Sequence, residues 1–483
     1  MKTIQKYEIY LLLFITNAVA MLLELVAARI LSPLYGSSNT IWTIIITVML
    51  LANAVGNLLG GKLSDKYKIS SLKSVLLFLS GAFTLLIAII NGQVMNNIID
   101  FKDKSTIGFS ISEIVLFLLP CVTIGAFSPI INKVELTEKE TVGKKSGHIY
   151  TVITVGSLFG TVFGGLVLIP HFGCAAILYG TAIMLLAYAL IYAFSERSKF
   201  SFGYGFALIL SVILTVQPAM GGNSNMIILD TNENYVRIYD AEKDGEPVRM
   251  FSVGGGFSSV SYIAPEKQNE LIFTYTQAYN RALDAFPEAK DFLMMGGAGY
   301  SYPRYLISHY DDKTIDVVEI DGGVTEAAKK YFFLQDFIDQ YGTDRLGLYT
   351  DDARQYLQKT EKKYDIIMND CFTGHSPVRG LATAEAVMDI KAHLTENGIY
   401  ATNINHPTTR FFTSEVKTLL SSFQYVWVQL TDEETPDANW MIFASDHDYG
   451  FDTEHVQITD DDIVFTDDYA PVEVFDEIST ERK

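Results

Sequence analysis

The sequence predicts two halves of different fold: an N-terminal bundle of transmembrane α-helices, and a C-terminal Rossmann-like α/β domain preceded by a small antiparallel β domain. Three observations indicate this. Residues 1–221 carry nearly all of the long apolar runs, whereas residues 222–483 have the composition of a soluble domain. Short β-like runs separated by turn residues follow in 222–285. Strand-like runs then alternate with helical segments in 286–483.

Seven apolar stretches in the first half are long enough to cross a membrane as helices. They cover about residues 9–31, 41–61, 72–91, 107–131, 149–170, 172–194 and 200–217. Glycines such as Gly156 and Gly160 would let neighbouring helices approach closely in lipid. Glu24, inside the first stretch, has two interpretations: a transport or coupling site, or a carboxylate that is protonated or paired with Arg29 or a neighbouring helix. The lipid bilayer is therefore one expected partner.

Charge is divided as unevenly as hydropathy. Residues 222–483 contain 46 acidic and 21 basic side chains, a net charge of −25, while residues 1–221 have a net charge of +5. So acidic a domain is a poor candidate for nucleic-acid binding, because phosphates require a basic surface. The three cysteines, Cys121, Cys174 and Cys371, lie far apart, so they indicate neither a disulfide framework nor a metal site.

The second half begins with β-like runs at residues 226–229, 236–239 and 248–253, followed by an amphipathic helix over 268–286. The strands of the α/β domain are predicted at residues 292–295, 315–320, 346–349, 364–368 and 399–404, with a late hairpin-like pair at 426–430 and 440–444. Polar residues follow several of these strands. Doubly wound sheets bind their ligands at the carboxyl ends of the strands, so we expect a site there.

One stretch carries most of the functional prediction. Residues 292–321 read as strand, glycine turn, helix, strand and acidic tip. The turn contains three glycines: Gly296, Gly297 and Gly299. The tip carries Glu319 and Asp321. In a βαβ unit such glycines let the backbone approach a ligand, and an acid about 20 residues later accepts hydrogen bonds from a ribose. The stretch therefore predicts a nucleoside site.

Six short segments of the second half form an ordered set: GGAGYS at 296–301, VEID at 318–321, TDDARQYL at 350–357, YDIIMND at 364–370, LATAEAV at 381–387 and TDDYAPVE at 466–473. Together they resemble the polyamine aminopropyltransferases (spermidine and spermine synthases), and more closely their membrane-fused relatives. The resemblance covers about residues 226–478. It implies a class I S-adenosylmethionine-type fold whose substrate is a sulfonium nucleoside, decarboxylated S-adenosylmethionine. In this family an amine such as putrescine attacks the carbon γ to the amino group, and 5′-methylthioadenosine leaves.

The resemblance assigns roles to the matching residues. The glycine turn would lie under the sulfonium-bearing chain. Glu319, at the strand tip it shares with Asp321, would hold the ribose hydroxyls, and Asp352 would meet the adenine amino group. Tyr300 takes the place of a family glycine and would close the pocket over the ligand. Asp370 would orient and deprotonate the attacking amine, although its place after a strand also suits a helix cap or a turn acid. Since a sulfonium is a good leaving group, neither a metal, a prosthetic group nor a covalent nucleophile is expected.

Several positions depart from the family pattern. Gly299 stands where the family has an acid that binds the free amine of the substrate, and Thr373 stands where it has a second acid. The family's polar segment before a glutamine has become Val253-Gly254-Gly255, with Ser258 at the later site. Because a polyamine is a multiply charged cation, these losses weaken the expectation that one binds. Without the acid at position 299, intact S-adenosylmethionine would also fit, and its own carboxylate could cyclise to homoserine lactone.

Three functions therefore compete. The first is an enzyme that releases methylthioadenosine, by transfer to an amine or by self-cyclisation. The second is a methyltransferase on the same fold, and the third is a nucleoside sensor that gates the membrane bundle. Other polar candidates are His375 for substrate contact and Arg304 for a substrate carboxylate or the start of the helix, while Asp467-Asp468-Tyr469 suits a structural latch or an acidic metal site. A homodimer is compatible with the resemblance.

Basic residues indicate the topology of the membrane half. They cluster at alternate connections between the apolar stretches, which predicts a cytoplasmic N-terminus. Seven spans would then place residues 222–483 outside, whereas the expected substrate is a cytosolic metabolite. Either the seventh stretch does not cross the membrane, or the domain faces the exterior.

Overall fold

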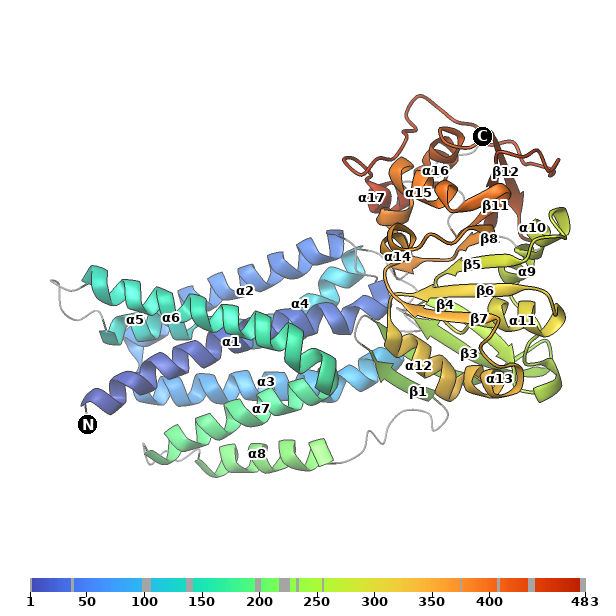
Figure 1. Ribbon diagram of the computed structural model, residues 1–483. Helices are drawn as coiled ribbons and strands as arrows, with labels where there is room; N and C mark the ends of the chain where they lie inside the picture. The colour runs from blue at the N-terminus through green and yellow to red at the C-terminus, as the bar shows by residue number, and fades with distance from the viewer. Residues whose placement is uncertain are drawn as a thin grey trace. The chain divides into compact units, whose positions relative to one another are not determined.

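The computed structural model describes residues 2–35, 39–97, 106–135, 142–195, 201–216, 226–231, 234–253, 256–373, 376–405, 409–432 and 439–477. The chain divides into two compact units, Met1–Ser224 and Asn225–Lys483. Figure 1 labels the helices and strands of both units.

The first unit is built from helices: α1 (Lys2–Tyr35), α2 (Asn39–Lys66), α3 (Ile69–Asn97), α4 (Thr106–Gly125), α5 (Phe127–Glu135), α6 (Val142–Phe163), α7 (Ile169–Ser195) and α8 (Ser201–Val216). A one-turn π-helix, Gly164–Leu168, connects α6 to α7. In the described part of the chain, six segments are long and apolar enough to cross a membrane. That is one fewer than the seven predicted stretches, because α8 has only 16 residues.

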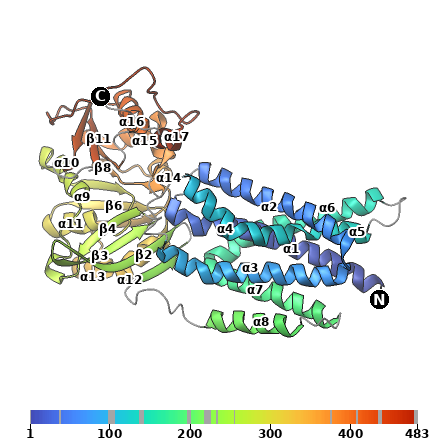
Figure 2. The ribbon, with the colours of Figure 1, turned by 180° about the vertical axis from the view of Figure 1, so that it is seen from behind.

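Glycines lie where the helix backbones approach most closely. Both ribbon views show α1 beside α6 and α3 beside α7 (Figures 1 and 2). A Cβ on Gly160 of α6 would come within 2.2 Å of the Ala18 carbonyl oxygen in α1, and one on Gly60 of α2 would come within 2.3 Å of the Ala126 carbonyl oxygen. The prediction that small residues set the helix spacing is confirmed. Glu24 is partly buried in α1, and both of its interpretations stay predictions.

The second unit begins with a four-stranded antiparallel sheet of β1 (Met226–Asp230), β2 (Tyr235–Lys243), β3 (Glu246–Val253) and β4 (Gly256–Tyr262), in that order. Asp244 and Gly245 form the tight turn between β2 and β3, with φ of 54° and 80°. The first three strands were predicted, but β4 was not. The predicted helix over 268–286 is instead two shorter helices, α9 (Thr274–Ala278) and α10 (Asn280–Ala285).

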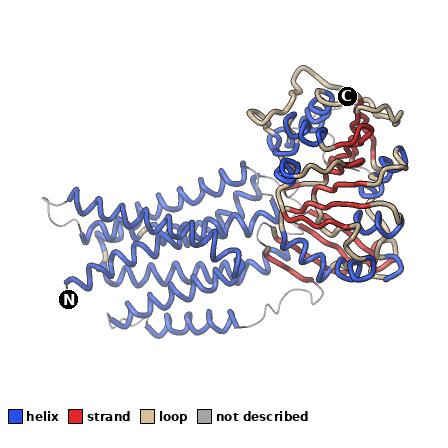
Figure 3. Tube along the Cα trace, in the orientation of Figure 1, coloured by secondary structure: helices blue, strands red, loops and turns tan. Residues whose placement is uncertain are grey.

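A seven-stranded sheet follows, in the order β12-β13-β11-β8-β5-β6-β7. Figure 3 draws the strands of the second unit in red and its helices in blue. Its strands are β5 (Asp291–Met295), β6 (Thr314–Glu319), β7 (Leu346–Thr350), β8 (Tyr364–Asn369), β11 (Leu394–Ile404), β12 (Tyr425–Leu430) and β13 (Trp440–Ser445). Strands β5, β6, β7, β8 and β11 pair in parallel, whereas β13 is antiparallel to both of its neighbours. The predicted doubly wound sheet and its late hairpin pair are confirmed.

Alternate residues of the central strands point into two separate cores. In β5, Phe292 and Met294 belong to the core beneath α11 (Ser301–His309), α12 (Gly322–Tyr331) and α13 (Leu334–Tyr341). Leu293 and Met295 belong to the opposite core, beneath α14 (Ala353–Lys359), α15 (Ala384–Ala392) and α16 (Arg410–Leu420). The small sheet contributes side chains to the first core, among them Phe251. Burial on both faces explains why these strands are continuously apolar, and it leaves the carboxyl ends of the strands as the place for a site.

Candidate functional site

The glycine turn connects β5 to α11 in a conformation that needs small residues. Gly296 has φ of +91°, and a Cβ there would come within 2.6 Å of the Asp370 carbonyl oxygen. A Cβ on Gly297 would come within 2.7 Å of the Tyr300 ring. Ala298 and Tyr300 also have positive φ, 42° and 57°, which is unfavourable for residues with a side chain. The turn therefore brings three backbone segments together at the ends of β5, β6 and β8.

The Glu319 carboxylate stabilises this turn by accepting hydrogen bonds from its backbone. Its Oε2 accepts the N–H groups of Gly297 and Ala298 at 2.9 and 3.1 Å, and its Oε1 accepts that of Asp321 at 3.1 Å. Burial raises the pKa of the Glu319 carboxyl, and the three N–H donors oppose this effect. Since a carboxylate offers about four acceptor positions, about one remains for a ligand hydroxyl. The structure thus places Glu319 at the turn, and its contact with a ribose stays a prediction.

The place beside Gly299 is filled by the protein itself. The Gly299 N–H donates to the Ser259 hydroxyl at 3.0 Å. A Cβ on Gly299 would lie 2.6 Å from both the Ser259 Cβ and the Phe332 ring. A carboxylate side chain at position 299 would therefore collide with β4 and with the end of α12.

Tyr300 and Asp321, the other residues predicted at this edge, make internal contacts. The Tyr300 side chain is fully buried, and its hydroxyl lies 2.8 Å from that of Thr325. Asp321 caps α12 by accepting the Gly323 N–H at 2.9 Å, and its second oxygen accepts the Thr231 hydroxyl at 2.5 Å. Both residues support the turn from behind, and their direct contact with a ligand stays a prediction.

Asp370 follows β8 beside the turn. Its N–H donates to the Met295 carbonyl at 2.9 Å, which holds it next to the end of β5. Its Oδ1 accepts the Asn403 side-chain amide at 3.0 Å. Burial raises the pKa of the Asp370 carboxyl to about 6, against the opposing hydrogen bonds of Asn403 and Tyr275. A carboxyl with this pKa is half ionised near pH 6 and mostly ionised at neutral pH, which suits a general base.

Two partners of Asp370 were missed in the sequence. Tyr275 lies in the segment read only as an amphipathic helix, and its hydroxyl also donates to the Ser258 carbonyl at 2.8 Å. Asn403, near the end of β11, accepts the Asn439 side-chain amide at 2.9 Å with its own carbonyl oxygen. A polar residue at the end of a predicted central strand was the available signal for Asn403, whereas nothing in the local pattern singled out Tyr275.

A cavity of about 430 Å³ lies next to Asp352, at the start of α14. It is lined by Asp352, Arg354, Gln355, Gln358, Val378, Gly380, Leu381 and Asp467. Asp352 caps α14 by accepting the Gln355 N–H at 2.9 Å, and no such bond occupies its other oxygen in the described residues. The cavity volume is within the range of small-molecule sites, and Asp352 offers it a hydrogen-bond acceptor.

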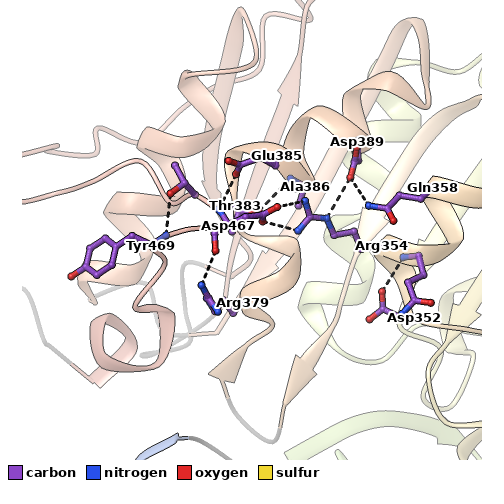
Figure 4. Close-up of polar contacts among 12 residues, drawn as sticks. Asp352, Arg354, Gln358, Arg379, Thr383, Glu385, Ala386, Asp389, Asp467 and Tyr469 are labelled. Atoms are coloured by element: carbon purple, nitrogen blue, oxygen red, sulfur yellow. Dashed lines mark hydrogen bonds and ion pairs between the residues drawn. The ribbon is translucent and has the colours of Figure 1, made fainter.

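Three of the six family-like segments meet beside this cavity (Figure 4). Both Asp467 oxygens accept the Arg354 guanidinium at 2.7 Å, and the Thr383 hydroxyl donates to Asp467 at 2.7 Å. The Arg354 guanidinium therefore holds the pKa of Asp467 down to about 2. These contacts agree with the predicted latch. In the described part of the chain, no group of three or more His, Cys, Asp or Glu side chains is arranged to hold a metal ion.

Of the remaining polar candidates, Arg304 is buried in the core, and the others lie outside the described residues. His375 and Gly254-Gly255 are outside them. Arg304 is 1% exposed and packs against the Phe332 ring, 5.6 Å from its centroid. Burial lowers the pKa of its guanidinium to about 10. Arg304 lines none of the cavities described here, which favours the interpretation that it supports the start of α11.

Comparison with known proteins agrees with this geometry. The Spermine/spermidine synthase domain family matches residues 279–432, which include Glu319, Asp352 and Asp370. The polyamine aminopropyltransferase of Vibrio vulnificus is 29% identical over 160 residues, 32% of this chain and 51% of that protein. That of Methanocaldococcus jannaschii is 31% identical over 121 residues, 25% of this chain and 41% of that protein. The chain thus spans about half the length of the curated relatives it matches.

Among solved structures, the spermidine synthase of Thermotoga maritima aligns with 52% of this chain and 83% of that chain, at 21% identity and a TM-score of 0.38. The family match covers the central strands together with Glu319, Asp352 and Asp370, and the strand order of the sheet is that expected for the class I S-adenosylmethionine-type fold. Residues 279–432 of the second unit are therefore similar to the Spermine/spermidine synthase domain family, and part of this unit is similar to polyamine aminopropyltransferases.

Proposed function

We propose that the chain is an aminopropyltransferase that acts on decarboxylated S-adenosylmethionine. The nitrogen of an amine forms a bond to the carbon γ to the substrate's amino group, the bond from that carbon to the sulfonium breaks, and methylthioadenosine leaves as a neutral thioether. The attacking nitrogen loses one proton, which Asp370 accepts. The observation that carries the proposal is the Asp370 carboxylate, with its pKa near 6, beside the glycine turn.

The arrangement around Asp370 supports this role. The adenine end of the nucleoside would occupy the cavity next to Asp352, and the ribose would bind near Glu319. The sulfonium chain would then extend over the glycine turn toward Asp370. Because the leaving group is already activated, the site needs to remove water and align the amine with the carbon–sulfur bond. Asn403 and Tyr275 would orient the carboxylate that does this.

The identity of the amine is the open part of the proposal. The missing acids at positions 299 and 373 are compatible with an acceptor of lower charge than a polyamine. They are also compatible with cleavage of intact S-adenosylmethionine without an acceptor. Figure 1 locates the strand ends β5, β6 and β8, where each of these reactions would occur.

Product analysis of the purified full chain tests the proposal. Incubation with decarboxylated S-adenosylmethionine and a panel of amines should release methylthioadenosine, and Asp370→Asn should lower the rate by about 10²- to 10⁴-fold. Release from S-adenosylmethionine alone would identify the acceptor-free reaction. Formation of S-adenosylhomocysteine would identify a methyltransferase, and nucleoside binding with no turnover in either protein would favour the sensor.

The catalytic unit faces the cytoplasm in this proposal. The 16 residues of α8 span about 24 Å, less than the roughly 30 Å of a bilayer core. Six crossings from a cytoplasmic N-terminus return the chain to the cytoplasm, where the substrate is made. A C-terminal fusion to a reporter that is active only in the cytoplasm should be active, whereas activity of an export-dependent reporter at the same position would contradict this topology.

A further inference from the structure

One buried acid of the catalytic unit has no role in the reaction described above. Glu415 lies on α16 and is 2% exposed. Its Oε2 accepts no hydrogen bond from the described part of the chain. Burial raises the pKa of this carboxyl from 4.5 to about 8, so the acid is mostly neutral at pH 7. A neutral carboxyl still has an O–H donor and an acceptor oxygen, and native structures rarely leave such groups unpaired in the interior.

A second polar group at this edge of the sheet also lacks a full set of partners. The Asn403 side chain, near the end of β11, is buried. Its amide nitrogen has two N–H groups. One donates to the Asp370 Oδ1 at 3.0 Å, and the other meets no acceptor in the described part of the chain. The Asn403 carbonyl oxygen accepts the Asn439 amide at 2.9 Å, so the side chain cannot turn over without losing two hydrogen bonds.

Glu415 and Asn403 line the same small cavity. Its volume is about 10 Å³, which is room for about one water molecule and for nothing larger. Thr402 also lines it, and most of the remaining wall is apolar, with Leu381 and Phe411 among its residues. A buried water needs two to four polar partners, and these three polar side chains supply them. One such water does not replace the solvation of bulk water, so the Glu415 carboxyl stays neutral.

We propose that the cavity binds one water molecule, which accepts the second Asn403 N–H and donates to the Glu415 carboxyl, and that Glu415 thereby positions Asp370. This inference rests on the proposed function of Asp370 as the base. Glu415 touches no reacting atom and acts through the water and Asn403, so it is a positioning residue. Without an acceptor for its second N–H, the Asn403 amide would turn away from Asp370, and the ionised form of Asp370 would lose a stabilising hydrogen bond.

An apolar and a polar replacement of Glu415 test the link. In the full chain, Glu415→Leu removes both oxygens and should move the acidic limb of kcat/KM, which Asp370 sets, to higher pH. The expected shift is about half to one pH unit, a three- to tenfold change in the ionisation constant for one lost hydrogen bond. Glu415→Gln should leave the limb in place, because its amide is neutral and keeps an acceptor oxygen. An unmoved limb in Glu415→Leu, or an equal shift in Glu415→Gln, would overturn the proposal.

Thr418→Val is the matched control for the loss of a buried polar side chain from α16. Thr418 is buried, its hydroxyl donates to the Ser414 carbonyl at 2.7 Å, and it does not line the cavity. The acidic limb of this variant should stay where it is in the wild type. A shift as large as that of Glu415→Leu would trace both effects to the packing of the helix, and the proposal would be wrong.

Neighbouring groups do not obscure the titration of Asp370. The titratable side chains around Asp370 and Glu415 are Tyr275, Tyr279, Glu319, Asp352, Cys371 and Tyr400. Burial raises the pKa values of the three tyrosines and of Cys371 further above neutral pH. The two other acids remain in Asp370→Asn, so the titration that this variant loses belongs to Asp370.

Two measurements separate this inference from the proposed transfer. A crystal structure of the full chain should show one ordered water between Glu415 and Asn403 in the wild type, and its absence there would overturn the inference. The pKa of Asp370 can be measured without turnover, from the carboxyl-carbon NMR signal that Asp370→Asn lacks. If that pKa rises in Glu415→Leu and no amine yields methylthioadenosine, the positioning stands and aminopropyl transfer fails. If methylthioadenosine forms and the pKa stays unchanged, the transfer stands and the positioning is wrong.

Discussion

Ser259 accepts the N–H of Gly299 with its hydroxyl at 3.0 Å, so the small β-sheet is hydrogen-bonded to the glycine turn of the α/β domain. Ser259 is buried in β4, and the Phe332 ring occupies the other side of Gly299. The protein therefore fills, with its own atoms, the place where aminopropyltransferases carry an acid. The change at position 299 is part of the packing between the two sheets, and a single substitution cannot restore the acid.

Gly299→Ala should destabilise the catalytic unit. The new Cβ would meet the Ser259 Cβ and the Phe332 ring at 2.6 Å, and neither can move without disturbing the core. Overpacking of this kind costs about 1–3 kcal/mol, so the midpoint of thermal unfolding should fall. Gly380→Ala is the control, since a Cβ there meets nothing within 4 Å. Equal midpoints for the two variants would show that the turn is looser than the contacts indicate.

Glu319→Gln should weaken nucleoside binding more than it weakens folding. Glutamine has one acceptor oxygen, while Glu319 accepts three N–H groups with two oxygens. The amide nitrogen would face a backbone N–H, and the turn would change shape. We expect the KM for the nucleoside to rise about tenfold or more, as for loss of a hydrogen bond to a charged group. Calorimetric titration with methylthioadenosine measures the same effect without turnover, and unchanged affinity would remove Glu319 from the site.

The main strands could be predicted because burial on both faces leaves uninterrupted apolar runs. Residues 292–295 and 364–368 were located within one residue of β5 and β8 at each end. Strand β4 was missed because its sequence, GFSSVSY, is rich in serine and begins with glycine. Ser259 and Ser261 are buried and use their hydroxyls within the unit, as Ser259 does with a glycine 40 residues away. A pairing of this kind leaves no periodic signal.

Candidate site residues could be predicted where an acidic side chain ends or directly follows a predicted strand. Glu319, Asp352 and Asp370 each follow or end a strand, and the fold brings them to one edge of the sheet. Glu415 was not predictable. In α16 nearly every side chain from Phe411 to Leu419 is buried, so the helix lacks a polar face on which an exposed acid would be expected. Its orientation depends on the loop after β8 and on the end of β11, which are distant in the sequence.

The reaction rate should depend on the ionisation of Asp370. Burial raises its pKa to about 6, and only the ionised carboxylate can accept a proton from the amine. The quantity kcat/KM for the amine should therefore fall about tenfold for each pH unit below 6, and this limb should be absent from the residual activity of Asp370→Asn. Asn403→Ala removes a hydrogen bond that stabilises the ionised form, so it should move the limb to higher pH. A rate that is independent of pH between 5 and 7 would exclude Asp370 as the base.

The folding stability of the catalytic unit should fall as pH rises toward 8, because of Glu415. Burial raises the pKa of this carboxyl from 4.5 to about 8. The unfolded chain therefore releases the proton near pH 4.5, while the folded chain keeps it until near pH 8. The stabilising contribution of the neutral acid is complete below pH 4.5 and is lost as pH rises through 8.

Glu415→Gln removes this contribution, so the midpoint of its thermal unfolding should fall less between pH 5 and 8 than that of the wild type. The buried neighbours Tyr400 and Cys371 have pKa values raised by burial, so they do not titrate in this range. Burial also raises the pKa of Asp370, so its contribution to stability also falls as pH rises. This loss occurs at lower pH, between 3.8 and about 6. Asp370→Asn should therefore change the acidic part of the stability curve and leave its slope between pH 6 and 8 intact. Parallel curves for Glu415→Gln and the wild type would mean that water reaches Glu415 in solution and keeps its pKa ordinary.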